Sequence, residues 1–303
     1  RYGVFELLFK PNGIAALGRD LDYARQVWSR EEGYPGDAIY RDFYRDVGFD
    51  LDFDYVRPYL PSPEHRGFTG IKYHHISDDP WHKLPYDRQA ALNKAAEHAQ
   101  HFLNARIAQV QHLSGIMGRP PLILSPYDAE LFGHWWYEGV EFLDYFARKA
   151  WFDQKVFDLT TPSHYLRRHP TQQVATPSAS SWGEEGYWRV WLNETNEWIY
   201  PHLQVAQERM TKLARKFPNA TGLQDRALKQ AARELRLAQS SDWPFILRTG
   251  TSPDYARKRV KDHLLRFITL HEQLTATQVD EVFLSRIEAT DNLFPEINYR
   301  YWA

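Results

Sequence analysis

From about residue 173 to the C-terminus, the sequence is an almost unbroken series of amphipathic helical segments. Apolar residues recur there at helical spacing, and short breaker segments separate the runs. Ser252 followed by Pro253 combines a capping residue with a proline in the first helical turn. We therefore predict an all-α domain over residues 173–303, with helices at 193–217, 223–240, 253–274 and 279–289.

The first 172 residues follow a different pattern. A long helix is predicted from Asp87, a plausible N-cap, to Gly118. Short apolar runs at 121–125 (PLILS) and 156–160 flank a second helix, and this alternation is typical of βα units. We predict an α/β fold for residues 1–172, a piece of a parallel sheet or βα barrel. The expected elements are helices at 37–47, 87–118 and 138–151, and strands at 70–77, 121–125 and 156–160.

Composition excludes several classes of function. Lys and Arg number 37 against 39 Asp and Glu, a net charge of -2, which gives no basic surface for nucleic acid or an anionic membrane. No apolar run reaches the ~18–20 residues of a membrane span. The absence of cysteine removes disulfides, thiolate metal sites and cysteine nucleophiles. We predict a soluble, cytoplasmic protein.

Acidic and aromatic residues are densest in the segment 125–139, SPYDAELFGHWWYEG. Asp128, Glu130 and His134 follow the predicted strand 121–125, and active sites of βα folds form at the carboxyl ends of strands. The neighbouring aromatic residues could raise a carboxyl pKa enough to make a general acid. A helix that starts with an acidic turn and packs its aromatics is the alternative, and both interpretations stay open.

Two further segments pair aromatic residues with polar loops. Trp182 and Trp191 belong to a tryptophan-rich stretch that begins in the Ser/Gly-rich loop SSWGEEG. Asp242 and Trp243 follow the end of a predicted helix. Indole rings suit sugars, whose faces expose C–H groups and whose edges carry hydroxyls. Core packing is the alternative for Trp191, and a helix end is the alternative for Asp242 and Trp243. Trp182 lies in the loop and has no helical explanation.

Histidine offers one further possibility. His98 and His101 are three residues apart on the long predicted helix and could share a metal ion. The thirteen histidines are scattered, however, and no HEXXH-type spacing occurs. We therefore predict no metal site and no cofactor. Nucleotide-binding and serine-hydrolase motifs are also absent from the sequence.

Five segments in order resemble the 1,4-α-glucan branching enzymes of glycoside hydrolase family 57. They are EEGYPGDAIYRDFYRDVGFD, GFTGIKYHHIS, SPYDAELFGHWWYEG, ATPSASSWGEEGYWRVWLN and AQSSDWPFILRTG. The resemblance implies the C-terminal part of a distorted (β/α)7 barrel over 1–172 and a helical C-terminal domain over 173–303. It also implies a retaining mechanism in which Asp128 is the acid/base. For such an enzyme, we predict that the substrate-binding residues are Trp28, Glu130, His134, Trp182, Trp191, Asp242 and Trp243.

The motif of the family's Glu nucleophile is not found in this sequence, and residue 1 is Arg rather than Met. We therefore expect a chain that lacks the N-terminal half of the enzyme and is inert without it as a partner. The implied substrates are α-glucans such as amylose and glycogen, in glycogen biosynthesis. The alternatives are an α-amylase or 4-α-glucanotransferase of the same family, or a non-catalytic glucan-binding protein.

Overall fold

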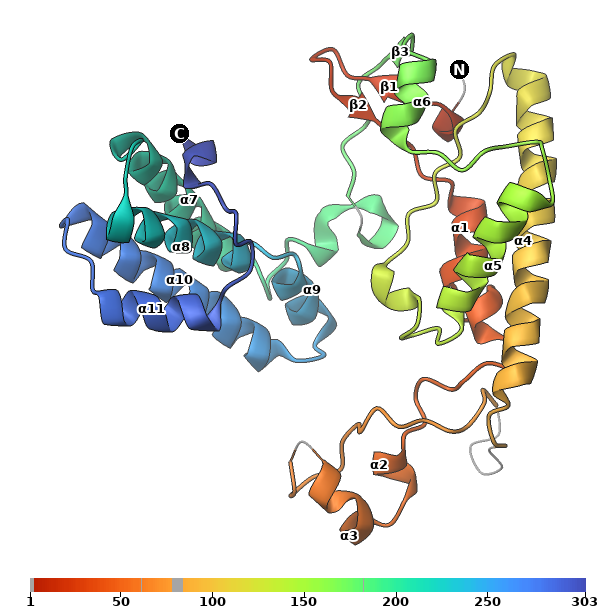
Figure 1. The fold of residues 1–303 in the computed structure, drawn as a ribbon, viewed down its shortest axis with the longest axis horizontal. Helices are drawn as coiled ribbons and strands as arrows, with labels where there is room; N and C mark the ends of the chain where they lie inside the picture. The colour runs from red at the N-terminus through yellow and green to blue at the C-terminus, as the bar shows by residue number, and fades with distance from the viewer. Residues whose placement is uncertain (1–2, 61, 78–83, 182) are drawn as a thin grey trace. The chain divides into compact units, whose positions relative to one another are not determined.

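The computed structural model describes residues 3–60, 62–77, 84–181 and 183–303. The chain divides into two compact units, Arg1–Pro177 and Ser178–Ala303 (Figure 1). The sequence pattern predicted a boundary at 172/173, a few residues before this division. Each unit is described by itself below.

The N-terminal unit is built around one long helix, α4 (Arg88–Met117), which follows the sequence prediction closely. Asp87 caps it by accepting a hydrogen bond from the Ala90 amide, 3.0 Å away. Gly118 ends it at a positive φ of 67°, the left-handed conformation that glycine adopts most readily. The shorter helix α5 (Gly139–Phe152) packs along α4, and α1 (Leu21–Trp28) lies in the same unit (Figure 1).

The described residues are helical with few strands, and the expected barrel sheet is not confirmed. The three strands of two residues each lie in the order β2-β1-β3, with β1 parallel to β3 and antiparallel to β2. They are β1 (Leu8–Phe9), β2 (Ala15–Ala16) and β3 (Gln173–Val174).

The predicted strands at 70–77, 121–125 and 156–160 are wrong in this structure. Residues 121–125 are extended, but their hydrogen bonds go to two different segments. The Leu122 amide donates to the Phe5 carbonyl at 2.8 Å, and the Leu124 carbonyl accepts from Asp20 at 2.9 Å. Residues 70–77 form only isolated bridges, such as His75 with Arg41. In both places the chain has extended conformation without a continuous partner strand, which a ladder requires.

The helix predicted over 37–47 is also wrong, because aspartate side chains bind the backbone locally. The Asp37 carboxylate accepts a hydrogen bond from Ile39 at 3.0 Å, and the Asp42 carboxylate accepts one from Tyr44 at 2.8 Å. Such bonds favour turns over helix. The next helices, α2 (Val47–Asp50) and α3 (Phe53–Val56), are short, as is the later α6 (Pro162–Arg168).

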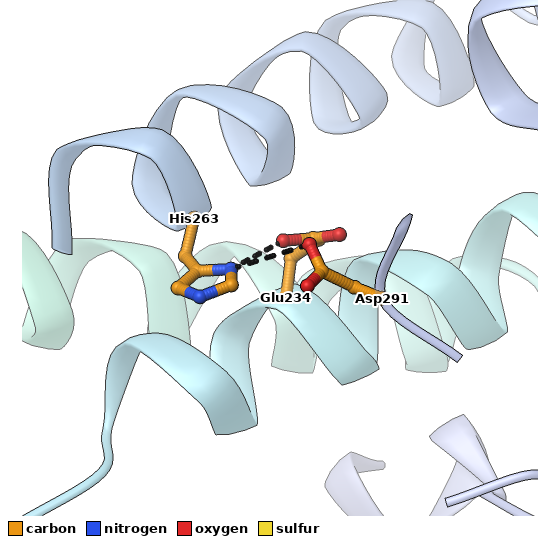
Figure 2. Close-up of side chains that lie close together, drawn as sticks. All are labelled: Glu234, His263 and Asp291. Atoms are coloured by element: carbon orange, nitrogen blue, oxygen red, sulfur yellow. Dashed lines mark hydrogen bonds and ion pairs between the residues drawn. The ribbon is translucent and has the colours of Figure 1, made fainter. Parts of the chain in front are cut away.

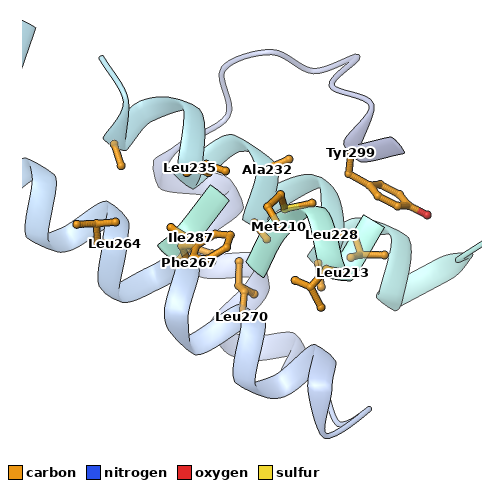
Figure 3. Close-up of a cluster of buried hydrophobic side chains, with 14 of the residues drawn as sticks. Met210, Leu213, Leu228, Ala232, Leu235, Leu264, Phe267, Leu270, Ile287 and Tyr299 are labelled. Carbon is orange, nitrogen blue, oxygen red and sulfur yellow. The ribbon is translucent and has the colours of Figure 1, made fainter. Parts of the chain in front are cut away.

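The C-terminal unit is the predicted helical domain. Its helices pack around one apolar core, whose side chains include Phe267, Leu270 and Ile287 (Figure 3). Pro253 stands in the first turn of the longest helix, as predicted. The helices are α7 (Ile199–Lys216), α8 (Gly222–Ala238), α9 (Asp242–Thr249), α10 (Pro253–Thr275) and α11 (Glu281–Thr290). Among the described residues of the chain, no helix has the length and apolar character to cross a membrane.

Candidate active site

Asp128 lies at the start of a single 3-10 turn (Ala129–Leu131), three residues after the extended segment 121–125 ends. Its carboxyl group makes no capping bond to this turn, and the side chain is exposed. Its backbone carbonyl accepts a hydrogen bond from Leu131 at 3.3 Å. The alternative interpretation, a helix that starts with an acidic turn, is met only by this short 3-10 turn, which carries Glu130. The Asp128 carboxyl is free to meet a ligand from solvent.

The loop after Asp128 is held by its own backbone. The Trp135 amide donates to the Glu130 carbonyl at 3.1 Å, and the Trp136 amide donates to the Leu131 carbonyl at 2.8 Å. Gly133 closes the loop with a hydrogen bond to the Trp136 carbonyl and has a φ of 84°, a conformation that other residues rarely adopt. Asp128 and Trp135 are thus ends of one internally bonded loop.

The two adjacent indoles of this loop have opposite environments. Trp136 is 1% exposed and packs against Tyr40 and Phe142, with ring centroids 5.4 and 4.9 Å away. Trp135 is 49% exposed. The packing interpretation is therefore correct for Trp136, while Trp135 keeps a large apolar face accessible.

Trp135 and Trp28 both line a small cavity of about 220 Å³ in the N-terminal unit. Trp28 is 48% exposed and is the last residue of α1. In the same region an arginine stacks on a tyrosine: the central guanidinium carbon of Arg41 lies 3.7 Å from the centre of the Tyr137 ring. The other lining residues are Arg30, Pro35, Arg41, Asp42, Phe43, Tyr44, Ile76 and Leu131. Flat apolar faces beside a few charged donors are the combination that binds sugars.

The structure places the other predicted residues of this segment near the cavity without making them part of its wall. His134 is exposed, and its ring meets the ring of Phe43 edge-on at 5.2 Å. Glu130 is exposed and contributes its backbone carbonyl to the loop. Their roles as substrate-binding residues stay predictions.

Glu138 is a buried carboxyl group that sequence reasoning missed. Its side chain is 1% exposed, and Oε1 accepts a hydrogen bond from the Arg41 backbone amide at 3.1 Å. Burial raises the pKa of Glu138, and hydrogen bonding to the Tyr86 hydroxyl and to the Arg41 amide partly offsets this. In the sequence, Glu138 resembles an ordinary acid at a helix start, and its partner lies 97 residues away. No local signal could have revealed the contact.

The histidines considered for a metal site bind tyrosines instead. His98 Nδ1 lies 2.7 Å from the Tyr40 hydroxyl, and His101 Nδ1 lies 2.7 Å from the Tyr34 hydroxyl. Burial lowers the pKa of His98. These contacts hold residues 34–40 against α4. The two imidazole rings hydrogen-bond to different tyrosines rather than facing a shared metal ion.

Three buried ionisable side chains meet in the C-terminal unit (Figure 2). His263 Nδ1 lies 2.7 Å from Glu234 Oε2 and 3.7 Å from Asp291 Oδ2, and the three residues present ligand atoms within 4.8 Å of one another. Arg266 forms an ion pair with Asp291, and Arg259 lies 3.8 Å from the other Asp291 oxygen. Because guanidinium groups already compensate the carboxylates, the arrangement fits a buried ion-pair network between helices better than a metal site.

The predicted binding residues of the C-terminal unit differ in exposure. Trp243 is 8% exposed, donates its indole N–H to the Leu237 carbonyl at 2.7 Å and belongs to the helical core. Its burial favours the packing interpretation. Asp242 is exposed and accepts from Ser240 at 2.6 Å, whereas Trp191 is half-buried. Trp182 lies outside the described residues.

A second and larger hollow, about 780 Å³, runs along α7. Its wall carries amide, charged and aromatic side chains rather than a catalytic carboxyl pair. The lining residues are Tyr200, Leu203, Gln204, Gln207, Glu208, Thr211, Lys212, Arg215 and Gln239. This surface was not anticipated from the sequence.

Comparison with known proteins shows similarity to glucan branching enzymes. Residues 202–302 match the family described as 1,4-alpha-glucan branching enzyme, C-terminal. A 1,4-alpha-glucan branching enzyme of Thermococcus kodakarensis is 31% identical over 294 residues, which cover 94% of this chain and 40% of that protein. The resemblance to branching enzymes of glycoside hydrolase family 57 is confirmed.

Solved structures extend the similarity over the whole chain. The crystal structure of a GH57-type branching enzyme from Pyrococcus horikoshii is 30% identical with a TM-score of 0.82, over 99% of this chain and 54% of that one. The α-amylase AmyC from Thermotoga maritima is 44% identical with a TM-score of 0.83, over 100% of this chain and 57% of that one. The chain therefore spans about half the length of these relatives. Both a branching enzyme and an amylase share its fold.

Proposed function

We propose that this chain carries the acid/base part of a retaining 1,4-α-glucan branching enzyme. The exposed Asp128 carboxyl, at one end of the loop that presents Trp135 to a cavity, is the observation that carries the proposal. The similarity to branching enzymes over 94% of the chain supports it. Because the chain covers 40% of that relative, we assign the Glu nucleophile to a region outside these 303 residues.

In the proposed reaction, Asp128 acts twice. As the α-1,4 bond breaks, its carboxyl group donates a proton to the leaving glycosidic oxygen while the nucleophile forms a covalent bond to the anomeric carbon. The resulting Asp128 carboxylate then removes the proton from the 6-hydroxyl of an acceptor glucan. That oxygen attacks the anomeric carbon and displaces the nucleophile, which closes an α-1,6 linkage.

Trp28 and Trp135 are the proposed sugar platforms of this site. Each is about half exposed, and both line the same cavity. Trp191, Glu130, His134 and Asp242 are the further proposed contacts to substrate. The barrel belongs to the same proposal. The extended residues 121–125, which hydrogen-bond to segments at Phe5 and Asp20, are the part of the chain that would continue into a parallel sheet.

An α-amylase is the second candidate, because AmyC is 44% identical over the whole chain. The two activities differ in the acceptor, which is a glucan hydroxyl in branching and water in hydrolysis. Amylose incubated with the protein that contains this chain in full separates them. Branching produces α-1,6 linkages, and isoamylase then releases short chains from the product. Reducing ends without α-1,6 linkages would assign the amylase, and an unchanged polymer would leave only glucan binding.

A further inference from the structure

Glu138 occupies an unusual position for a carboxylate at a helix start. It precedes α5 and makes no side-chain bond to the amides of its own helix. A carboxylate at this position ordinarily accepts from those amides, which are left without partners. Its side chain turns away instead and accepts from the backbone amide of Arg41, 3.1 Å away. Glu138 thus caps a distant segment.

The segment that Glu138 holds forms one side of the cavity. Arg41, Asp42, Phe43 and Tyr44 line it from this side, and Trp135 lines it from the Asp128 loop. Glu138 comes three residues after Trp135, so one short stretch of chain carries both the exposed indole and the carboxylate. The bond from Arg41 to Glu138 therefore connects the two walls directly.

Each of the two segments that this hydrogen bond joins is also held by contacts of its own. Gly139 brings the backbone so close to Phe132 and Trp136 that an added Cβ would lie 2.9 to 3.3 Å from atoms of those two residues. On the other side, Tyr40 is fully buried and its hydroxyl lies 2.7 Å from His98 on α4. A partly buried hydrogen bond between two such packed segments restrains their separation.

We propose that Glu138 is a positioning residue that sets the width of the Trp28–Trp135 cavity by holding the Arg41–Tyr44 segment against the Asp128 loop. This inference rests on the proposed function, because it takes the cavity as a glucan subsite. Glu138 acts through the backbone of Arg41 and does not touch substrate. What it supplies is an acceptor oxygen at a fixed place.

The test compares Glu138→Met with Glu138→Gln in the protein that contains this chain in full. Methionine has a similar volume and no oxygen, whereas glutamine keeps an acceptor for the Arg41 amide. We expect Glu138→Met to raise KM for amylose and weaken maltoheptaose binding about tenfold or more, with kcat within about twofold. Glu138→Gln recovers most of the affinity. Glu141→Gln, at a partly exposed position of the same helix, serves as the matched control and binds normally.

Amide hydrogen exchange at Arg41 provides a readout that is independent of glucan. Exchange is expected to accelerate in Glu138→Met and to stay slow in Glu138→Gln. Three results would overturn the inference. Glu138→Met could lower kcat and leave KM unchanged, or both variants could bind glucan equally poorly. Binding could also stay normal in Glu138→Met although exchange at Arg41 is fast. If the unsubstituted protein neither binds maltoheptaose nor converts amylose while Arg41 exchange responds as expected, the glucan function fails and Glu138 still holds the cavity wall.

Discussion

The N-terminal and C-terminal units are stabilised in different ways. In the C-terminal unit, helices α7, α8, α10 and α11 share one continuous core of aliphatic and aromatic side chains (Figure 3). The N-terminal unit has two smaller apolar clusters, and long loops between them are fixed by buried carboxylates such as Asp46 and Glu138. The loop of the proposed acid/base, Asp128, lies in the unit whose loops are held by polar contacts. Hydrogen bonds fix loop geometry directionally, whereas an apolar core mainly supplies stability.

The largest stability effect should follow from opening the helical core. Phe267 is fully buried in α10, and Phe267→Ala should lower the free energy of unfolding by about 3–5 kcal/mol. Leu265, in the same helix but 61% exposed, is the control, and Leu265→Ala should change stability by less than about 0.5 kcal/mol. Urea unfolding measures both variants.

Native-state hydrogen exchange of Phe267→Ala tests whether the units are separate. Amides of α8 and α10 should lose protection, while those of α4 keep theirs. Equal loss of protection in α4 would mean that the two units unfold together, and the contrast between them would not hold.

A smaller loss of stability is expected when a buried, hydrogen-bonded carboxylate of the N-terminal unit is replaced. The Asp46 carboxylate is fully buried and accepts hydrogen bonds from Gly48, Thr69 and Gly70. Burial alone would raise its pKa, but these bonds outweigh it and lower the pKa to about 2. A depressed pKa contributes stability above the unfolded-state value of about 3.9, and this contribution is lost as pH falls toward 2.

Asp46→Asn should therefore destabilise the chain by about 2 kcal/mol at neutral pH, with the difference shrinking between about pH 4 and pH 2. Asp54→Asn is the matched control, because the Asp54 side chain is 87% exposed. Chemical denaturation across this pH range measures the difference. A pH-independent difference would show that the Asp46 charge does not contribute.

The third effect is one of affinity rather than stability. Trp28→Ala should weaken maltoheptaose binding about tenfold, which is about 1.4 kcal/mol, through loss of a stacking face. Trp151→Ala, which removes an indole that is 74% exposed on α5 and does not line the cavity, should bind normally. Calorimetric titration of both variants with maltoheptaose measures the two affinities. It distinguishes loss of a sugar-stacking face from the general effect of removing an exposed indole.

Local signals in the sequence were sufficient for most helices. Asp87, Gly118 and Pro253 each mark a helix end through contacts within a few residues, and the predicted helices lie close to those observed. The strand predictions failed because a β-strand requires a partner strand, and the periodicity of the sequence does not specify which segment that partner is. Residues 121–125 illustrate this, since their bonds go to segments more than a hundred residues earlier in the chain.

For the site, the sequence indicated the correct segment but not the environment of each side chain. Trp135 and Trp136 are neighbours, and only the fold decides that one is exposed and the other buried. Trp243 shows the same limit, because it was predicted at a binding surface and packs in a core. Glu138 could not be predicted, since its partner Arg41 is remote in sequence.

The most direct test of the proposed chemistry is Asp128→Asn in the protein that contains this chain in full, assayed on two substrates. Loss of the general acid should slow cleavage of amylose about 10²–10⁴-fold. A 4-nitrophenyl maltooligoside has a leaving group that needs little protonation, so formation of the glycosyl-enzyme from it should be nearly unaffected. Asp158→Asn, with a side chain that is 83% exposed, is the control. A loss on amylose below tenfold, or an equal loss on both substrates, would contradict the assignment of Asp128 as the acid/base.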